Sequence, residues 1–180
     1  MMIDDILKYN ARFVAEKSYE KYATSGQPTR KLVVLSCMDT RLTELLPQAM
    51  GLRNGDAKFI KVAGGTMLSP YDSVIRSLLV AVYELGCEEM MVVHHSDCGL
   101  CHLEAQHFID LMKLRGVSDE ALAEAAEHVD LESYLSGFED TEEDVRRTVA
   151  AIQHHPLMPQ QVVVRGFMID SYTGELREVE

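Results

Sequence analysis

Residues that could do chemistry gather in two short segments of the sequence. Cys37 follows the apolar run 32–36, and His95 and Cys98 follow the apolar run 90–93. Two thiolates and an imidazole form a mixed sulfur and nitrogen donor set that suits Zn²⁺. Three protein ligands leave the fourth position of a tetrahedral zinc ion open to water, which is the catalytic form of a zinc site. The sequence therefore predicts a zinc site built from Cys37, His95 and Cys98.

A carboxylate and a guanidinium follow the first of these residues closely. Asp39 and Arg41 lie two and four positions after Cys37. An Arg–carboxylate pair fixes the orientation of the Asp and keeps it ionised. Asp39 could then accept a hydrogen bond from water on the metal, or occupy the fourth zinc position itself. The sequence leaves both the open and the closed form of the site possible.

A parallel sheet would bring the two segments together. Helical patterns alternate with strand-like apolar runs along the chain, which is typical of an α/β fold. We predict a central mostly parallel β-sheet, with about four parallel strands plus a C-terminal edge strand, flanked by helices. The predicted strands are 31–36, 57–62, 89–93, 161–165 and the hairpin 166–179. Ligands gather beyond the carboxyl ends of parallel strands, where the two segments would meet.

Length and composition limit the class of protein. The 180 residues carry no repeat or linker, so we expect a single domain over 1–180. The net charge of −12 argues against nucleic acid or an anionic membrane as a partner and favours a small substrate. No apolar run approaches the ~20 residues that cross a bilayer, and the first residues lack signal-peptide features. We therefore expect a cytoplasmic protein.

Two separated motifs resemble those of the β-class carbonic anhydrases. Segment 37–41, Cys-Met-Asp-Thr-Arg, matches the C-x-D-x-R motif of that family, and segment 95–99, His-Ser-Asp-Cys-Gly, matches its H-x-x-C-G motif. Residues 63–65 and 72–78 look like the A-G-G loop of the family and the helix that follows it. The resemblance runs over about residues 31–103. Two motifs in the right order are a specific signal, whereas either alone would be weak.

The resemblance implies a carbonate dehydratase, a lyase that hydrates carbon dioxide reversibly to bicarbonate by a metal-bound hydroxide. It implies one Zn²⁺ per chain and a homodimer or higher homo-oligomer, in which the predicted N-terminal helix 3–23 packs on a partner subunit. Carried over by position, it implies these roles: zinc ligands Cys37, His95 and Cys98; catalytic residues Asp39 and Arg41; substrate-pocket residues Gly64 and Gly65.

The chain also departs from the family pattern. His94 stands where the family often has Gly, and Val62 stands where Asn commonly precedes the A-G-G loop. Because adjacent residues of a strand point to opposite faces, only one of the two neighbouring histidines is expected to face the metal. Spacing to Cys98 favours His95, so we expect His94 to be a polar loop or interface residue.

Three alternatives remain from the sequence. Cys98 and Cys101 form a C-x-x-C pair between a strand and a predicted helix, the layout of a thioredoxin-like dithiol redox protein. A closed, non-catalytic zinc site would use Cys101 or Asp39 as a permanent fourth ligand. A related hydrolase would act on a sulfur analogue of carbon dioxide. The sequence assigns no role to the acidic helical region 118–144.

Overall fold

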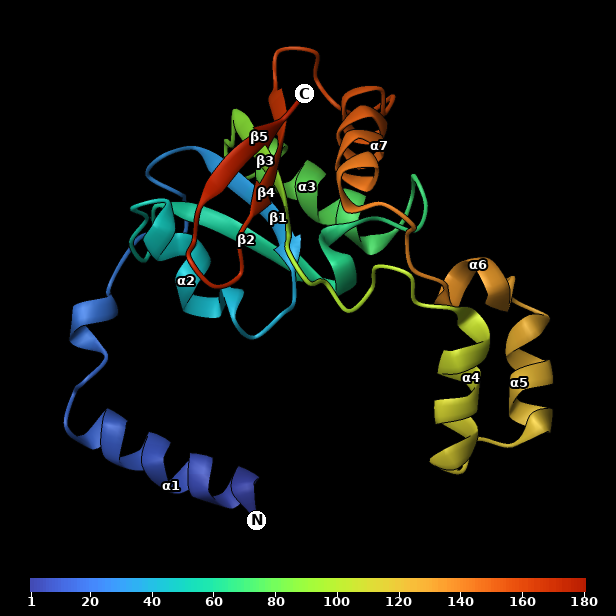
Figure 1. The fold of residues 1–180 in the computed structure, drawn as a ribbon. Helices are drawn as coiled ribbons and strands as arrows, with labels where there is room; N and C mark the ends of the chain where they lie inside the picture. The colour runs from blue at the N-terminus through green and yellow to red at the C-terminus, as the bar shows by residue number, and fades with distance from the viewer.

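The computed structural model describes residues 1–180 and contains one five-stranded sheet (Figure 1). The strand order is β2-β1-β3-β4-β5; the first four strands are parallel, and β5 runs antiparallel to β4. This arrangement confirms the predicted mostly parallel sheet with a C-terminal edge strand. The strand bounds are β1 (Leu32–Cys37), β2 (Ala57–Val62), β3 (Glu89–His95), β4 (Val163–Ile169) and β5 (Leu176–Val179).

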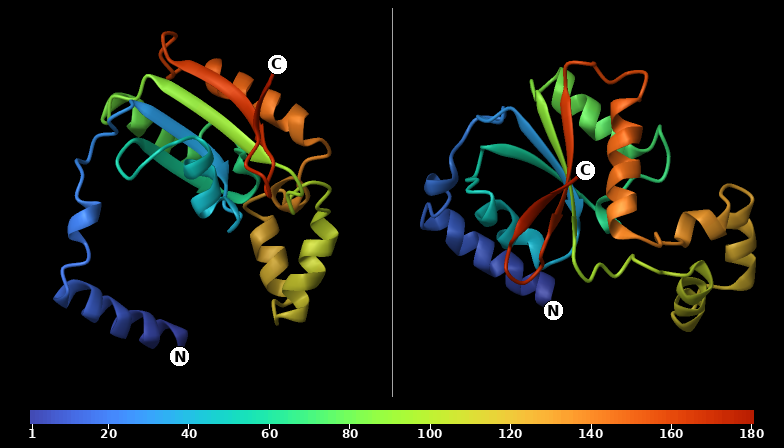
Figure 2. Two further views of the ribbon diagram at one scale, coloured as in Figure 1. Left: turned by 60° about the vertical axis from the view of Figure 1, so that its left-hand side comes forward. Right: turned by 45° about the horizontal axis from the view of Figure 1, so that its top comes forward.

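Helices cover both faces of the sheet. Helices α3 (Ser73–Tyr83) and α7 (Thr141–Gln153) lie on one face, and α2 (Leu42–Ala49) lies on the other (Figure 2). Strand β1 is buried from Val33 to Cys37, as its unbroken apolar run predicts for a strand covered on both sides. Alternate residues of β1 therefore feed two separate apolar clusters, one on each face.

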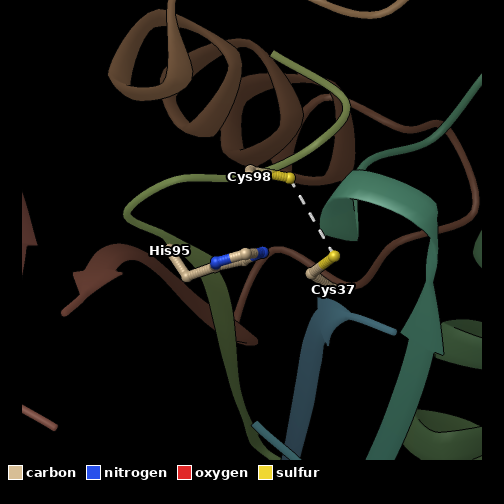
Figure 3. Close-up of side chains that lie close together, drawn as sticks. All are labelled: Cys37, His95 and Cys98. Carbon is tan, nitrogen blue, oxygen red and sulfur yellow. Dashed lines mark hydrogen bonds between the residues drawn. The ribbon is translucent and has the colours of Figure 1, made fainter. Parts of the chain in front are cut away.

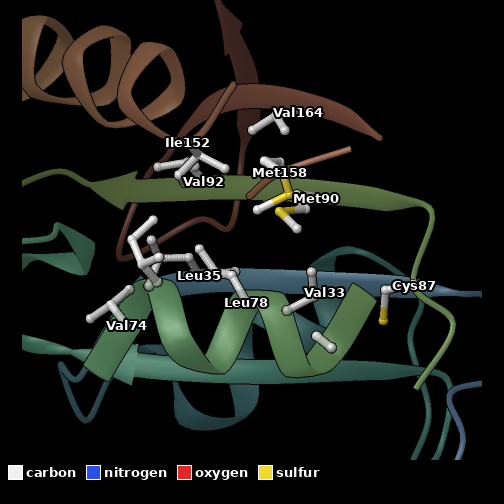
Figure 4. Packing of buried hydrophobic residues seen from close by; sticks show 12 residues of the cluster. Val33, Leu35, Val74, Leu78, Cys87, Met90, Val92, Ile152, Met158 and Val164 are labelled. Carbon is white, nitrogen blue, oxygen red and sulfur yellow. The ribbon is translucent and has the colours of Figure 1, made fainter. Parts of the chain in front are cut away.

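The larger cluster lies between the sheet and helices α3 and α7. Val33 and Leu35 of β1 and Val92 of β3 pack there against Leu78 of α3 and Ile152 of α7 (Figure 4). These five side chains are at most 1% exposed. Packing this tight holds the central strands in a fixed register, and the register in turn sets where their carboxyl ends lie.

The start of α3 is fixed by its capping residue. Both Asp72 oxygens accept backbone hydrogen bonds: Oδ1 from Val74 N at 2.9 Å and Ile75 N at 3.1 Å, and Oδ2 from Leu68 N at 2.8 Å. Such a cap satisfies N–H groups that the first helical turn leaves unpaired. Helix α3 therefore begins at Ser73, directly after its capping residue.

The N-terminal segment differs from its prediction. Helix α1 ends at Ala15, and a separate 3₁₀ turn, η1 (Glu20–Tyr22), follows it. The prediction of one helix over 3–23 is wrong because Lys17 adopts a φ of 53°, and left-handed backbone cannot continue a right-handed helix. Helix α1 (Met2–Ala15) has no buried residue and lies away from the sheet in Figure 1 and in the left view of Figure 2.

A second outlying part consists of α4 (Ala105–Leu114), α5 (Asp119–Ala126) and α6 (Leu131–Leu135). These three helices form a lobe beside the sheet (Figure 1). The acidic region 118–144 thus forms α5, α6 and the first turn of α7. No helix in the structure is long and apolar enough to span a membrane.

Candidate metal centre

Three sulfur and nitrogen donors meet at the carboxyl edge of the sheet. Cys37 is the last residue of β1, His95 is the last residue of β3, and Cys98 lies in the turn after β3 (Figure 3). Strands β1 and β3 are neighbours, so residues 58 positions apart share one pocket. All three residues are buried, and their donor atoms lie within 4.8 Å of one another. The structure thus brings together the three residues that the sequence predicts as zinc ligands.

The orientation of His95 leaves one ring nitrogen available. Its Nδ1 lies 2.8 Å from the carbonyl oxygen of Ser96 and donates to it, so Nε2 carries a lone pair. Nε2 is buried and has no hydrogen-bond partner, which is unusual for a polar atom in a protein interior. A cation between Nε2 and the two sulfurs would satisfy it, and this donor set fits Zn²⁺.

The two thiols are close enough to share a proton. The Sγ atoms of Cys37 and Cys98 lie 4.0 Å apart. The hydrogen bond from Cys98 outweighs burial and lowers the pKa of Cys37 to about 4. The same interaction raises the pKa of Cys98 above its usual value. One thiolate is therefore present at neutral pH, and a thiolate is the form that binds a metal.

A bidentate ion pair lies beside this group. Arg41 donates from Nε to Oδ1 of Asp39 at 3.0 Å and from Nη2 to Oδ2 at 2.8 Å. These hydrogen bonds lower the pKa of Asp39 to about 2. Asp39 Oδ2 also lies 3.9 Å from Nε2 of His95. Arg41 itself is held by the carbonyl of Asp97 at 3.2 Å and by the ring face of Tyr172 at 5.5 Å. An ionised carboxylate thus stands in a fixed orientation next to the three donors.

The two predicted glycines lie in tightly packed backbone next to the three donors, Gly65 against the backbone of Cys37 and Gly64 against Leu100. They form the turn η2 (Ala63–Gly65), with φ values of 71° and 77° at Gly64 and Gly65. A Cβ on Gly65 would lie 2.9 Å from the backbone nitrogen of Cys37, and one on Gly64 would lie 2.5 Å from Cδ2 of Leu100. Only glycine allows this close approach at these backbone angles.

An apolar cavity of about 340 Å³ lies next to this turn. Eight of the twelve residues that line it are hydrophobic. They include Val62 and Ala63, which precede the glycines, and Leu100, which follows the second motif. The lobe closes the cavity from outside through Phe108 and Tyr134. The outlying helices therefore help to enclose a cavity next to the η2 turn, which the sequence alone did not indicate.

The structure corrects the expectation for His94. This side chain is fully buried, and its Nε2 lies 2.8 Å from Oδ2 of Asp144 in α7. The prediction of a polar loop or interface residue is wrong because β3 continues through His95. Strand alternation then turns His94 toward the face that α7 covers. The polar residue Asp144, fifty positions later, gives no sequence signal of this pairing.

The second cysteine of the C-x-x-C pair stands apart from the donors. Cys101 forms an isolated β-bridge with Phe138, and its Sγ lies 3.7 Å from the carbonyl oxygen of Glu139. Helix α4 begins only at Ala105, so the prediction of a helix directly after the second motif is wrong. Because no helix N-terminus faces Cys98, the thioredoxin-like layout is absent. Cys101 is also outside the group of three donors.

The fold and the site together define a class of protein. A parallel α/β sheet that presents two thiols and an imidazole at its carboxyl edge, beside an ionised carboxylate, has the layout of a metal-dependent enzyme. The family profile of the carbonic anhydrases matches residues 32–176 of this chain. The chain belongs to the carbonic anhydrase family, in its β class, and the family confirms the predicted enzyme class of carbonate dehydratases.

Individual relatives agree with this assignment. The chain is 49% identical over 175 residues to a Bacillus subtilis (strain 168) protein named "Putative carbonic anhydrase YvdA", covering 97% of this chain and 89% of that one. The crystal structure of β-carbonic anhydrase isoform I from Trichomonas vaginalis superposes with a TM-score of 0.90 at 27% identity, covering 99% and 97% of the two chains. A carbon disulfide hydrolase of Acidithiobacillus thiooxidans is 29% identical over 92% of this chain and 85% of its own length.

Proposed function

We propose that this chain catalyses the reversible hydration of carbon dioxide to bicarbonate with one zinc ion held by Cys37, His95 and Cys98. The observation that carries the proposal is the buried group of three donor atoms within 4.8 Å of one another. The unpartnered Nε2 of His95 supports a metal at this position, because a buried polar atom without a partner is costly. Membership of the carbonic anhydrase family supports both the metal and the reaction.

Asp39 and Arg41 prepare the site for the reaction. Zinc, when bound, lowers the pKa of water from ~15.7 to about 7 and so supplies a nucleophile at neutral pH. Asp39 remains a carboxylate through that range because Arg41 holds its pKa near 2. It can therefore accept a proton in a hydrogen bond from the attacking water and orient that water. Both Asp39 oxygens are engaged by Arg41, which favours the open form of the site, with Asp39 off the metal.

The apolar cavity suits the substrate. Carbon dioxide is small and without net dipole, so it partitions into a hydrophobic space more readily than bicarbonate does. Gly64 and Gly65 do not line the cavity, but its lining includes Ala63, which precedes them in the η2 turn, and Leu100, against which Gly64 packs. We assign these glycines to the wall between the substrate cavity and Cys37.

The N-terminal helix supports a homodimer or higher homo-oligomer. Its apolar residues are exposed in the single chain: Ile3 is 70%, Ile6 59% and Leu7 63% exposed. An amphipathic helix without a core of its own needs a second surface to bury its apolar face. A partner subunit supplies that surface in this proposal. Thiol ligands also favour a reducing compartment, so we place the enzyme in the cytoplasm.

Metal analysis and rapid kinetics test the proposal together. We expect one zinc per chain and stopped-flow hydration of carbon dioxide that falls at acidic pH. Cys37→Ser and Cys98→Ser should lose zinc and activity, whereas Cys101→Ser, the matched control, should keep both. A chain that stays metal-free after reconstitution with zinc would overturn the proposal. A zinc-loaded chain without hydration activity would instead indicate the closed, structural zinc site.

A second candidate reaction is the hydrolysis of carbon disulfide. The observation that favours it is the similarity to the carbon disulfide hydrolase of Acidithiobacillus thiooxidans. Carbon disulfide is linear like carbon dioxide, and two waters convert it to carbon dioxide and two molecules of hydrogen sulfide. Release of hydrogen sulfide, absent with Cys98→Ser, would support this candidate. Hydration of carbon dioxide without any release of hydrogen sulfide would exclude it.

A further inference from the structure

A buried polar pair lies behind the metal centre, on the opposite face of the sheet. His94 is fully buried, and the side chain of Asp144 is 1% exposed. Nε2 of His94 donates to Oδ2 of Asp144 at 2.8 Å, and Arg147 from the next turn of α7 binds the other carboxylate oxygen. Burial alone would raise the pKa of Asp144, but the hydrogen bonds from His94 and Arg147 lower it. The proposed reaction gives this buried pair no direct part.

The pair lies at the end of β3, next to the proposed zinc ligand His95, where the strand has a neighbour on one side only. Strand β3 pairs with β1 only as far as Val93, opposite Ser36. Its last two residues, His94 and His95, pair with β4 alone. A strand end with a neighbour on one side only has fewer backbone hydrogen bonds to hold it. Side-chain anchors therefore matter more for the position of His95 than for residues in the middle of the sheet.

His94 anchors this strand end to α7. The helix packs on β3 and β4, and Asp144 lies in its first turn. The hydrogen bond from His94 joins the end of β3 to a helix that the core holds in place through Ile152. Because adjacent residues share a rigid backbone, an anchor at His94 restricts the direction in which His95 points.

His94 also contacts the segment that supports the third ligand. The centre of its ring lies 5.6 Å from the centre of the Phe138 ring. The carbonyl oxygen of Phe138 accepts a hydrogen bond from His102 N at 2.8 Å, and Phe138 forms a β-bridge with Cys101. Cys98 begins the turn that ends at Cys101, where Cys101 N donates to Cys98 O at 3.0 Å. One buried imidazole thus touches the supports of both His95 and Cys98.

We propose that His94 is a positioning residue for the metal centre, and that its hydrogen bond to Asp144 holds His95 and Cys98 in ligand geometry. The inference rests on the proposed zinc site. Groups that orient metal ligands without touching the metal typically change metal affinity by about 10- to 100-fold when they are removed. A variant without the hydrogen bond between His94 and Asp144 should therefore release zinc faster, because the end of β3 and the turn at Cys98 can move.

Two substitutions at His94 separate this role from simple core packing. The amide nitrogen of Gln extends about as far as Nε2 of His, so His94→Gln keeps a donor within reach of Asp144. His94→Asn is one methylene shorter and cannot reach it. Zinc release from the full-length loaded protein to a chromogenic chelator gives the rate. The visible spectrum of the cobalt(II)-substituted protein reports ligand geometry without any activity measurement.

We expect His94→Asn to release zinc about tenfold faster or more and to shift the cobalt spectrum, whereas His94→Gln stays within about twofold of the wild type. Leu78→Ala is the matched control, because it destabilises the same core from α3, which carries no part of the pair, and should leave the spectrum unchanged. If His94→Asn does not fold, Asp144→Asn replaces it, with the same expected direction. A normal release rate and spectrum in these variants would refute the inference while zinc binding stands; a wild-type chain without zinc would refute the proposed function instead.

Discussion

Gly65→Ala tests whether backbone contact sets the position of Cys37. Gly65 has a φ of +77°, and an added Cβ would lie 2.9 Å from Cys37 N and 3.0 Å from the carbonyl carbon of Ser36. Both are backbone atoms, so no side chain can rotate away. Gly51 is the matched control, because its φ of +63° imposes a similar backbone strain while no atom lies within 4 Å of the added methyl.

The two substitutions should differ by the cost of the clash. An L-residue in left-handed backbone costs about 1–2 kcal/mol. Ala also lowers the conformational entropy of the unfolded chain relative to Gly, which offsets about 0.4–1 kcal/mol of this cost. Gly51→Ala should therefore lower the free energy of unfolding by about 1 kcal/mol. Gly65→Ala adds an overpacking cost of about 1–3 kcal/mol, so its total loss should be about 2–4 kcal/mol.

Urea unfolding of the metal-free proteins measures the loss of unfolding free energy in each variant. The rate at which a chelator removes zinc from the loaded proteins measures the effect on the three donors. The clash is relieved by moving either the η2 turn or the end of β1, and β1 carries Cys37. We therefore expect faster zinc release from Gly65→Ala and a normal rate from Gly51→Ala. Equal losses of stability and equal release rates in the two variants would refute the argument that Gly65 positions the first thiol.

Three other predictions concern the ion pair, the N-terminal helix and a helix cap. Arg41→Leu should raise the pKa of Asp39 from about 2 toward 3.8. In the wild type the lowered pKa of Asp39 stabilises the folded state above pH 3.8, and this stabilisation is lost as the pH falls toward 2. The variant lacks this stabilisation, so its acid unfolding should begin at a higher pH than that of the wild type. Ile6→Asp should convert the proposed oligomer to a monomer in sedimentation or light scattering, whereas Lys8→Asp, also on exposed α1, should not. Asp72→Ala should lower the free energy of unfolding by about 1–2 kcal/mol in urea, since it leaves the first turn of α3 uncapped, and Asp72→Ser should recover most of that loss.

That Cys37, His95 and Cys98 lie together could be predicted from the sequence, because each of them follows a pattern that can be recognised locally. Cys37 and His95 each end an apolar run, and parallel strands place such ends at one edge of the sheet. The spacing of Asp39 and Arg41 likewise allows a bidentate pair within one turn of chain. No long-range information was needed beyond the assumption that β1 and β3 are neighbours.

The supports of the centre could not be predicted in the same way. Strand alternation does place His94 opposite His95, but only once β3 is known to continue through both residues. The partner of His94 lies in α7, after the whole α4–α6 lobe, and no spacing rule connects residues across such an insertion. Similarly, the break after Ala15 depends on the left-handed backbone of Lys17, a residue type with no strong preference for that conformation.

The charge of the centre explains why a divalent cation suits it. The pKa of Cys37 is lowered and that of Cys98 is raised, so the two thiols together retain one proton at neutral pH. The neighbouring Asp39–Arg41 pair is neutral overall and leaves this balance unchanged. A dication that displaces the last thiol proton faces two thiolates and a neutral imidazole, so the buried group becomes electrically neutral. A monovalent cation would leave a negative charge in the interior, where an uncompensated charge is costly. Metal binding must then release the proton that the thiols retain, and a further proton wherever the raised pKa of His95 keeps its ring protonated, so the affinity of the site for zinc should rise with pH.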